Sequence, residues 1–117
     1  MIQVYVATKF ENKDQTRHVI ARLEAAGYHV TYDWTQSEQF SQEQAIADLR
    51  GVLQADFVVV LAEQHVAYKG TYVELGAALA SGTTVYLVGN GMDACVFANH
   101  PLVRRMARRS NEGAYRS

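Results

Sequence analysis

Apolar residues are arranged along this chain in two ways, as short continuous runs and as longer stretches with helical spacing. The runs at 2–7, 56–62 and 83–89 are apolar and bounded by polar residues, which is typical of buried strands. The segment 29–34 is predicted as another strand, and 95–98 as a short edge strand. The chain therefore offers several short strands separated by longer segments.

Those longer segments carry helical signals. In 12–28 the apolar residues recur every three or four positions, and Gly27 suits the C-terminal end of a helix. In 41–55, Ser41 is a typical N-cap with Gln44 at the capping-box position. The expected buried stripe of that helix is Ala45, Leu49, Val52 and Leu53. Further helices are predicted at 70–82 and 101–109.

Strands that alternate with helices predict a parallel sheet. We expect one α/β domain over 1–117, a doubly wound, Rossmann-like sheet of four to five strands with helices on both faces and a flavodoxin-like strand order. In such sheets ligands bind beyond the carboxyl ends of the strands, where the strand order reverses. The segments expected there are 7–10, the loop from Trp34, 61–70, and the chain from Gly89 onward.

Composition removes several classes of protein. The net charge of −1 argues against a general binder of nucleic acid polymers. There is one cysteine, and the four histidines lack ligand spacing, so we expect no metal and no cofactor. The short apolar start lacks signal-peptide features and no stretch is long enough for a membrane span, so a cytoplasmic location without membrane contact is the default.

A local basic cluster, RRMARR at 104–109, contrasts with the neutral whole. One interpretation is the solvated basic end of a last helix. The other is a binding site for a phosphate or an acidic partner.

Glu74 is a carboxylate in an otherwise small and apolar stretch, GTYVELGAALASG. One interpretation is structural: Thr71 and Glu74 match the capping-box pattern, with Thr71 as the cap. The other is chemical, because Glu74 shares its helix face with small residues that leave room for a flat ligand. A helix N-terminus would also keep a first-turn carboxylate ionised, and an ionised carboxylate can act as a nucleophile.

A second carboxylate, Asp48, lies in the preceding predicted helix, where a solvent-facing position is the simplest interpretation. Asp56 falls at a helix-to-strand junction and is better explained as a turn or capping residue. A phospho-receiver is disfavoured, because Ala7-Thr8-Lys9 follows the first strand in place of an acidic pair.

Three blocks of the chain resemble the nucleoside 2-deoxyribosyltransferase family. VYVATKF at 4–10 resembles its opening strand and loop, and DLRGVLQAD at 48–56 its Asp-Leu…Ala-Asp segment. GTYVELGAALASGTTVYLV at 70–88 resembles its Gly…Glu-Leu-Gly-x-Ala…Gly…Val helix and strand. The family includes transferases that exchange bases between deoxynucleosides and hydrolases that release the base from nucleoside monophosphates.

The resemblance implies catalytic roles for three residues. Glu74 matches the nucleophile that attacks C1′ of the sugar, Asp48 the acid that assists the departing base, and Tyr5 the tyrosine that holds the nucleophile. From the sequence pattern alone, Tyr5 also fits an ordinary core aromatic. The resemblance further implies a small nucleoside or nucleotide as substrate and a homo-oligomer, a dimer or higher.

The position that meets the 5′ end of the substrate departs from the family, because Tyr68 stands where transferases have Asp and nucleotide hydrolases have Ser. Lys69 and Thr71 nearby favour a nucleotide, since a lysine beside a helix N-terminus suits a phosphate; a surface lysine is the alternative. Trp34 fits either stacking on a base or closing the edge of the core. The expected substrate-binding residues are Ala7, Phe10, Trp34, Tyr68, Lys69, Gly70 and Thr71.

Two functions follow from these observations. The first is an enzyme that cleaves or transfers an N-glycosidic bond through a glycosyl–Glu74 intermediate. The second is a non-catalytic nucleotide-binding or sensor module on the same fold, which the short chain and the altered 5′ position favour.

Overall fold

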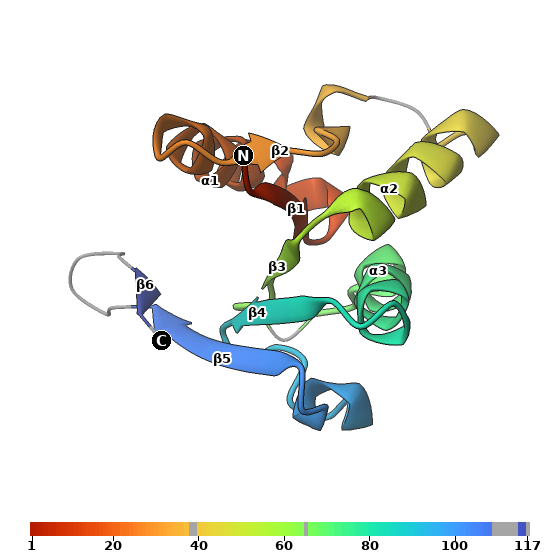
Figure 1. Cartoon of the computed structure of the whole chain (residues 1–117). Coiled ribbons are helices and arrows are strands. Elements are labelled where there is room, and N and C mark those ends of the chain that lie inside the picture. The colour runs from red at the N-terminus through yellow and green to blue at the C-terminus, as the bar shows by residue number, and fades with distance from the viewer. Residues whose placement is uncertain (38–39, 65, 109–114, 117) are drawn as a thin grey trace.

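The computed structural model describes residues 1–37, 40–64, 66–108 and 115–116. It forms one sheet in the order β2-β1-β3-β4-β5-β6, with helices on both sides (Figure 1). The strands are β1 (Gln3–Ala7), β2 (His29–Val30), β3 (Phe57–Leu61), β4 (Thr84–Val88), β5 (Val103–Arg108) and β6 (Tyr115–Arg116). The helices are α1 (Lys13–Ala25), α2 (Gln42–Gln54) and α3 (Lys69–Ala80), and the 3-10 turns are η1 (Phe10–Asn12), η2 (Trp34–Gln36) and η3 (Val96–Asn99).

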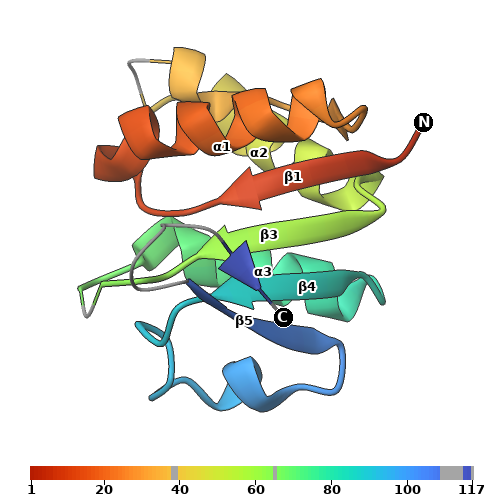
Figure 2. The same cartoon turned by 90° about the vertical axis from the view of Figure 1, so that its left-hand side faces the viewer.

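The first five strands are parallel, and their order, 2-1-3-4-5, is the predicted flavodoxin-like one. The two-residue strand β6 pairs antiparallel with β5, so the sheet has one strand more than the four to five predicted. Figure 2 shows α1 in front of β1 on one face and α3 behind the sheet on the other. The doubly wound arrangement is therefore confirmed.

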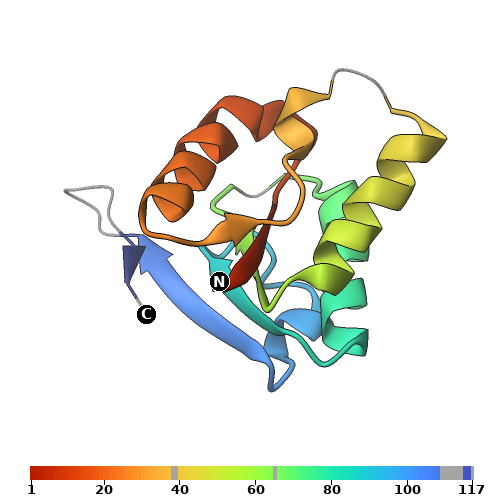
Figure 3. The same cartoon turned by 45° about the horizontal axis from the view of Figure 1, so that its top comes forward.

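Side-chain alternation along β1 separates the two halves of the core. Val4 and Val6 pack with Ile20 of α1, whereas Tyr5 and Ala7 belong to the cluster on the side of α2 and α3. Successive strand residues point to opposite faces, so the register of β1 alone sends Tyr5 toward α2 and α3. Figure 3 shows these two helices lying side by side.

Three predicted elements near the sheet edges were wrong. Within the helix predicted at 101–109, Val103–Arg108 forms strand β5 instead, because this part pairs with the free edge of β4, with Val85 N–H donating to the Leu102 carbonyl. The expected edge strand at 95–98 is replaced by η3. The strand predicted at 29–34 pairs only at His29–Val30, because the Asp33 carboxylate accepts from Thr35 N–H and begins η2.

Helix α2 begins as predicted, with Ser41 Oγ accepting from Gln44 N–H at 3.1 Å. Its predicted buried stripe was wrong apart from Val52. Leu49 and Leu53 are 37% and 60% exposed, and Ala45 is exposed as well. The buried residues of α2 are instead Gln44, Gly51 and Val52, because the helix packs against β1 and α3 along that narrow line.

Candidate active site

A cavity of about 650 Å³ opens beyond the carboxyl ends of β1 and β3, between α2 and α3. This is where the strand order reverses, the position at which open parallel sheets bind ligands. Its walls come from the loops after β1 and β2 and from the first turns of α2 and α3. The lining residues are Thr8, Lys9, Phe10, Glu11, Trp34, Phe40, Ser41, Gln44, Ala45, Asp48, Leu49, Ala67, Lys69, Gly70, Thr71, Val73 and Glu74.

Glu74 lies in the wall of this cavity and is 8% exposed. Its Oε2 accepts a hydrogen bond from the Tyr5 hydroxyl at 2.5 Å. The capping-box interpretation was wrong, because α3 begins at Lys69 with Tyr68 as its N-cap residue. Glu74 therefore lies in the second turn of α3, where its contact is with β1 and not with the helix's own N-terminus.

Burial is the main influence on the charge of Glu74. It raises the pKa of this carboxyl to about 7; the hydrogen bond from Tyr5 opposes the rise, and the charge of Asp48 adds to it. The expectation that the helix N-terminus keeps Glu74 ionised was therefore wrong. The group that favours the ionised form of Glu74 is Tyr5, because its hydroxyl donates a hydrogen bond to the carboxylate.

The Tyr5 hydroxyl is itself held in the protonated form. The residue is fully buried, and burial, followed by the nearby charge of Glu74, raises its pKa far above the ordinary value. Tyr5 is thus a neutral hydrogen-bond donor at any pH at which the protein is folded. The Tyr5 ring belongs to the core cluster, as expected of a core aromatic, while its hydroxyl contacts Glu74 in the cavity wall.

Asp48 lines the same cavity from α2 and is half-buried. Burial raises its pKa to about 6. In the described part of the chain, the buried side-chain oxygens without a hydrogen-bond partner are Asp48 Oδ1 and Thr71 Oγ1, and both residues line this cavity. Buried polar atoms are normally paired, so these two mark where a ligand's polar groups would be accepted.

Aromatic side chains form the mouth of the cavity. Trp34 is 4% exposed, and its Nε1 donates to the Val6 carbonyl at 2.7 Å, so it packs in the core while one part of it lines the cavity. Phe10 lies against Phe40, with ring centroids 4.9 Å apart in an edge-on arrangement. Phe40 is 84% exposed. These rings add an apolar part to the lining that also contains the two carboxylates.

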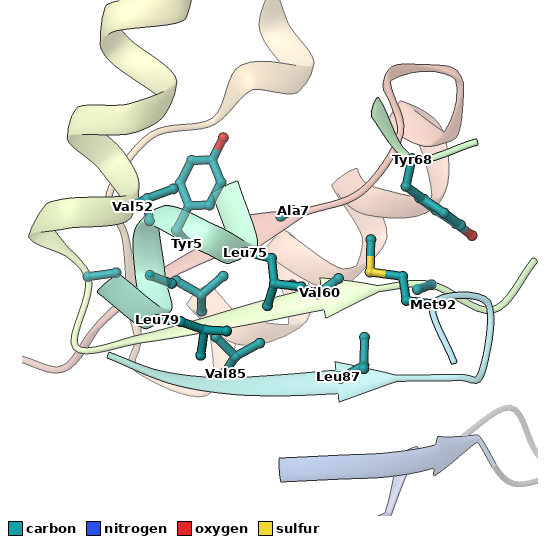
Figure 4. Close-up of a cluster of buried hydrophobic side chains, with 14 of the residues drawn as sticks. Tyr5, Ala7, Val52, Val60, Tyr68, Leu75, Leu79, Val85, Leu87 and Met92 are labelled. Carbon is teal, nitrogen blue, oxygen red and sulfur yellow. The ribbon is translucent and has the colours of Figure 1, made fainter. Parts of the chain in front are cut away.

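The structure does not bring every predicted residue to this lining. Ala7 is fully buried in the sheet, and Tyr68 is 1% exposed with its hydroxyl accepting from Gln64 N–H. Phe10, Trp34, Lys69, Gly70 and Thr71 do line the cavity. The Tyr68 ring belongs to the buried core cluster, where Figure 4 shows it near Met92.

The two arginines of the cluster whose side chains the structure describes, Arg104 and Arg105, do not line the cavity. Arg104 and Arg105 lie exposed on β5, where Arg105 pairs with Asp93, while Arg109 lies outside the described residues. The prediction that these arginines form the basic end of a helix was therefore wrong, because they lie on a strand.

Sequence reasoning placed Thr8 and the loop that ends at Phe40 at the ligand edge but named neither as a substrate-binding residue, and it missed Gln44. Thr8 Oγ1 donates to the Leu61 carbonyl, which ties the ends of β1 and β3 together beneath the cavity. Gln44 was assigned to capping, yet its side chain accepts from Ser37 Oγ at 2.6 Å and joins the β2 loop to α2. The available signal was position alone, because each follows a strand or opens a helix at the ligand edge of the sheet.

Among the described residues, no three histidine, cysteine, aspartate or glutamate side chains are grouped so that they could hold a metal ion. None of the described helices has the length and apolarity needed to cross a membrane.

Comparison with known proteins assigns the chain to a family. A family model described as nucleoside 2-deoxyribosyltransferase matches residues 4–106. The chain belongs to the nucleoside 2-deoxyribosyltransferase family. It is therefore an enzyme acting on the bond between base and sugar in small nucleosides or nucleotides.

Solved structures with the same fold include members of this family and related enzymes. The CMP N-glycosidase BcmB of Clostridium botulinum aligns with a TM-score of 0.70 and 19% identity, covering 95% of this chain and 92% of its own. A 2-deoxyribosyltransferase of Bacillus psychrosaccharolyticus aligns with a TM-score of 0.56 and 25% identity, covering 75% and 72%. A conserved protein of Enterococcus faecalis V583 aligns with a TM-score of 0.62 and 18% identity, covering 75% of this chain and 63% of its own. No curated protein matches the chain.

Proposed function

We propose that this enzyme cleaves or transfers the N-glycosidic bond of a nucleoside or nucleoside 5′-monophosphate through a covalent glycosyl–Glu74 intermediate. One observation carries the proposal: Glu74, held by Tyr5, and Asp48, with an unpaired buried oxygen, line one cavity from neighbouring helices. Two carboxyls in one cavity are the groups that glycosidic bond cleavage requires.

The two carboxyls take different roles in the first step. An ionised Glu74 oxygen attacks C1′ of the sugar while the bond from C1′ to the base nitrogen breaks. The electron pair of that bond stays on the base, which takes a proton from Asp48. The products of this step are a glycosyl ester of Glu74, the free base and an ionised Asp48.

The second step releases the sugar. Asp48, now a base, accepts a proton from water or from the N–H of a second base, and the oxygen or nitrogen attacks C1′ as the Glu74 ester bond breaks. Attack by water gives a hydrolase, and attack by another base gives a transferase. Tyr5 donates to Glu74 whenever the carboxylate is free, which favours Glu74 as a leaving group.

The different surroundings of the carboxyls support this assignment. Glu74 accepts a hydrogen bond that favours its ionised form, whereas Asp48 Oδ1 has no donor among the described residues. The two carboxyls interact, so one proton shared between them is the reactive state near neutral pH. In the free enzyme the pKa of Glu74, about 7, lies above that of Asp48, about 6, so this proton lies mainly on Glu74. The first step uses the form with the proton on Asp48, which substrate binding has to favour.

A 5′-monophosphate is the favoured substrate. Lys69 and Gly70 form the first turn of α3 at the cavity wall, where free backbone N–H groups attract an anion. Thr71 is 1% exposed, and its unpaired Oγ1 offers a further donor at the same place. Glu74 follows one turn along the same helix, so the phosphate and the anomeric carbon would both lie against α3.

A homo-oligomer in the cytoplasm is also part of the proposal. Leu53 of α2 and Val73 of α3 are each 60% exposed, and Val73 borders the cavity. Apolar side chains exposed beside a site suit a contact with a second copy. Light scattering after size exclusion measures the mass directly, and a monomer would remove this part of the proposal.

The test is a panel of nucleosides and nucleoside 5′-monophosphates, each with and without a second base, analysed by chromatography for free base and for new nucleoside. Base released in the absence of an acceptor indicates a hydrolase, and exchange indicates a transferase. Glu74→Ala should abolish both, and mass spectrometry of the quenched wild type should detect the glycosyl ester. Binding without turnover of any substrate would favour the non-catalytic module, and activity retained by Glu74→Ala would exclude the proposed nucleophile.

A further inference from the structure

Gly51 lies inside α2, and no local reason for a glycine is found in this part of the helix. Glycine inside a helix is less favourable than alanine, because its backbone loses more freedom on folding. Gly51 is nevertheless within Gln42–Gln54 and buried. A residue that weakens its own element usually serves a contact elsewhere in the fold.

The contact is with the residue that holds Glu74. A Cβ placed on Gly51 would come within 2.9 Å of Tyr5 Cδ1, 3.0 Å of Tyr5 Cε1 and 2.9 Å of Tyr32 Cβ. Favourable contacts between carbon atoms are about 3.5–4.0 Å, so even a methyl group does not fit. The Tyr5 ring therefore occupies the space that a side chain at position 51 would need.

Helix α2 cannot simply move away from Tyr5. The Gly51 carbonyl accepts a hydrogen bond from Thr31 Oγ1 at 2.7 Å, which ties this turn to the end of β2. The next residue, Val52, is fully buried, and Figure 4 shows it beside the Tyr5 ring. The same figure shows the Tyr5 hydroxyl directed away from strands β3 and β4.

We infer that Gly51 is a positioning residue for the proposed reaction: its lack of a side chain lets α2 close on the Tyr5 ring, which then holds its hydroxyl on Glu74 Oε2. The inference rests on the proposed function for its effect on rate. Its structural part, that Gly51 sets the Tyr5–Glu74 hydrogen bond, stands on the contacts alone.

The test compares Gly51→Ala with Tyr5→Phe, and Gly76→Ala serves as the matched control. Gly76 lies in α3, and a Cβ there would have no atom within 4 Å, so this variant adds the same methyl group to a helix without a conflict. The main measurement is the titration of the Glu74 carboxyl by NMR, assigned with Glu74→Gln. The groups acting on this carboxyl are Tyr5 of β1 and Asp48 of α2, and Lys69 of α3 shares the cavity wall.

Gly51→Ala should raise the pKa of Glu74, as Tyr5→Phe does, because both weaken the one hydrogen bond that favours the ionised form. Gly76→Ala should leave it unchanged. The double variant Tyr5→Phe/Gly51→Ala should titrate like Tyr5→Phe alone. In turnover, Gly51→Ala should lower kcat by roughly tenfold with little change in KM and move the acidic limb of kcat/KM to higher pH.

A folded Gly51→Ala protein whose Glu74 titrates as in wild type would overturn the inference. If Gly51→Ala does not fold, Gly51→Ala/Tyr5→Val is compared with Gly51→Ala/Tyr32→Gly, because each removes one of the two conflicts of the added methyl group. Recovery of folding with Tyr5→Val supports the inference. Recovery with Tyr32→Gly alone, or with neither, overturns it. Absence of turnover by the wild type would overturn the proposed function, while the NMR titration would still test the role of Gly51.

Discussion

Glu74 is a buried acid whose ionised form receives one hydrogen bond from a side chain. Its pKa of about 7 lies above the ordinary value, so the folded protein holds this proton more tightly than the unfolded chain. The resulting contribution to stability is complete at low pH and is lost as the pH rises through 7. Ionisation of Glu74 therefore destabilises the folded protein, and a functional role for the charge would explain why such a group is kept.

Replacing Glu74 by Gln should stabilise the protein at alkaline pH. The amide keeps the shape but cannot ionise, so the free energy of unfolding of Glu74→Gln relative to wild type should rise by about 3 kcal/mol between pH 4 and pH 8. Urea unfolding at both pH values measures this change. Glu24→Gln, on the exposed part of α1, is the control, and an equal response of both variants would contradict the prediction.

Asp48→Asn should slow the reaction most for substrates whose base needs a proton in order to leave. For an ordinary nucleotide, loss of the acid should lower kcat by roughly 10²–10⁴-fold. An N7-methylated purine nucleotide, whose base is already cationic, should be slowed far less. Steady-state rates for both substrates measure the ratio, and equal losses would assign Asp48 a role other than proton donor.

At the scale of single residues, the sequence predicted more of the chemistry than of the contacts. Glu74 and Asp48 were identified through a family resemblance, and they line one cavity. The capping-box pattern failed because α3 begins at Lys69, so Thr71 lies inside the helix and its hydroxyl caps no backbone N–H.

Under the proposed function, helix α3 combines an anchor and a reactive group on one face. Thr71 and Glu74 are one turn apart and both line the cavity, and the residues that follow Glu74 in the helix are small or apolar. The rigid helix fixes their separation, and neither depends on a loop. A substrate held at the start of α3 is thus held in register with Glu74.

Thr71→Val should separate stability from binding. Because the Thr71 hydroxyl is buried without a partner, replacing it by a methyl group should stabilise the free protein by about 1 kcal/mol. Urea unfolding in the absence of substrate measures this. Under the proposed function the same variant should raise KM for a nucleotide about tenfold and leave that for the nucleoside unchanged.

Thr71→Ser is the matched control, since it keeps the hydroxyl and removes only a methyl group. It should not gain stability, and its preference for nucleotides should remain. Thr71→Val that loses stability would show that the hydroxyl has a partner in solution.

At the scale of elements, prediction worked where the residues of a segment determine its structure by themselves. It failed where pairing with a neighbouring element determines the structure. The runs at β1, β3 and β4 are apolar enough to require burial on both faces. In contrast, VRRMAR contains good helix formers, and only the unpaired edge of β4 makes it a strand. No pattern within 101–109 contains that information.

The whole molecule is built around three strands that have parallel neighbours on both sides. Strands β1, β3 and β4 lie inside the sheet and carry the fully buried residues Val4, Val58 and Val85. The flavodoxin-like order could be predicted because few topologies accept right-handed crossovers with these lengths. The additional strand β6 could not, because it is two residues long.

Hydrogen exchange should reveal this arrangement. Amides of β1, β3 and β4 should exchange most slowly, at the rate of global unfolding, because their hydrogen bonds open only when both halves of the core open. Amides of β2 and β5, at the sides of the sheet, should exchange faster. Slowest exchange in α1 or β5 would place the stable centre elsewhere.

The hydrogen bond from Tyr5 to Glu74 joins residues 69 positions apart in the chain. Under the proposed function, a ribosome-bound chain that has folded only its first strands has neither this bond nor an assembled nucleophile. Such an unfinished chain would not react with nucleotides.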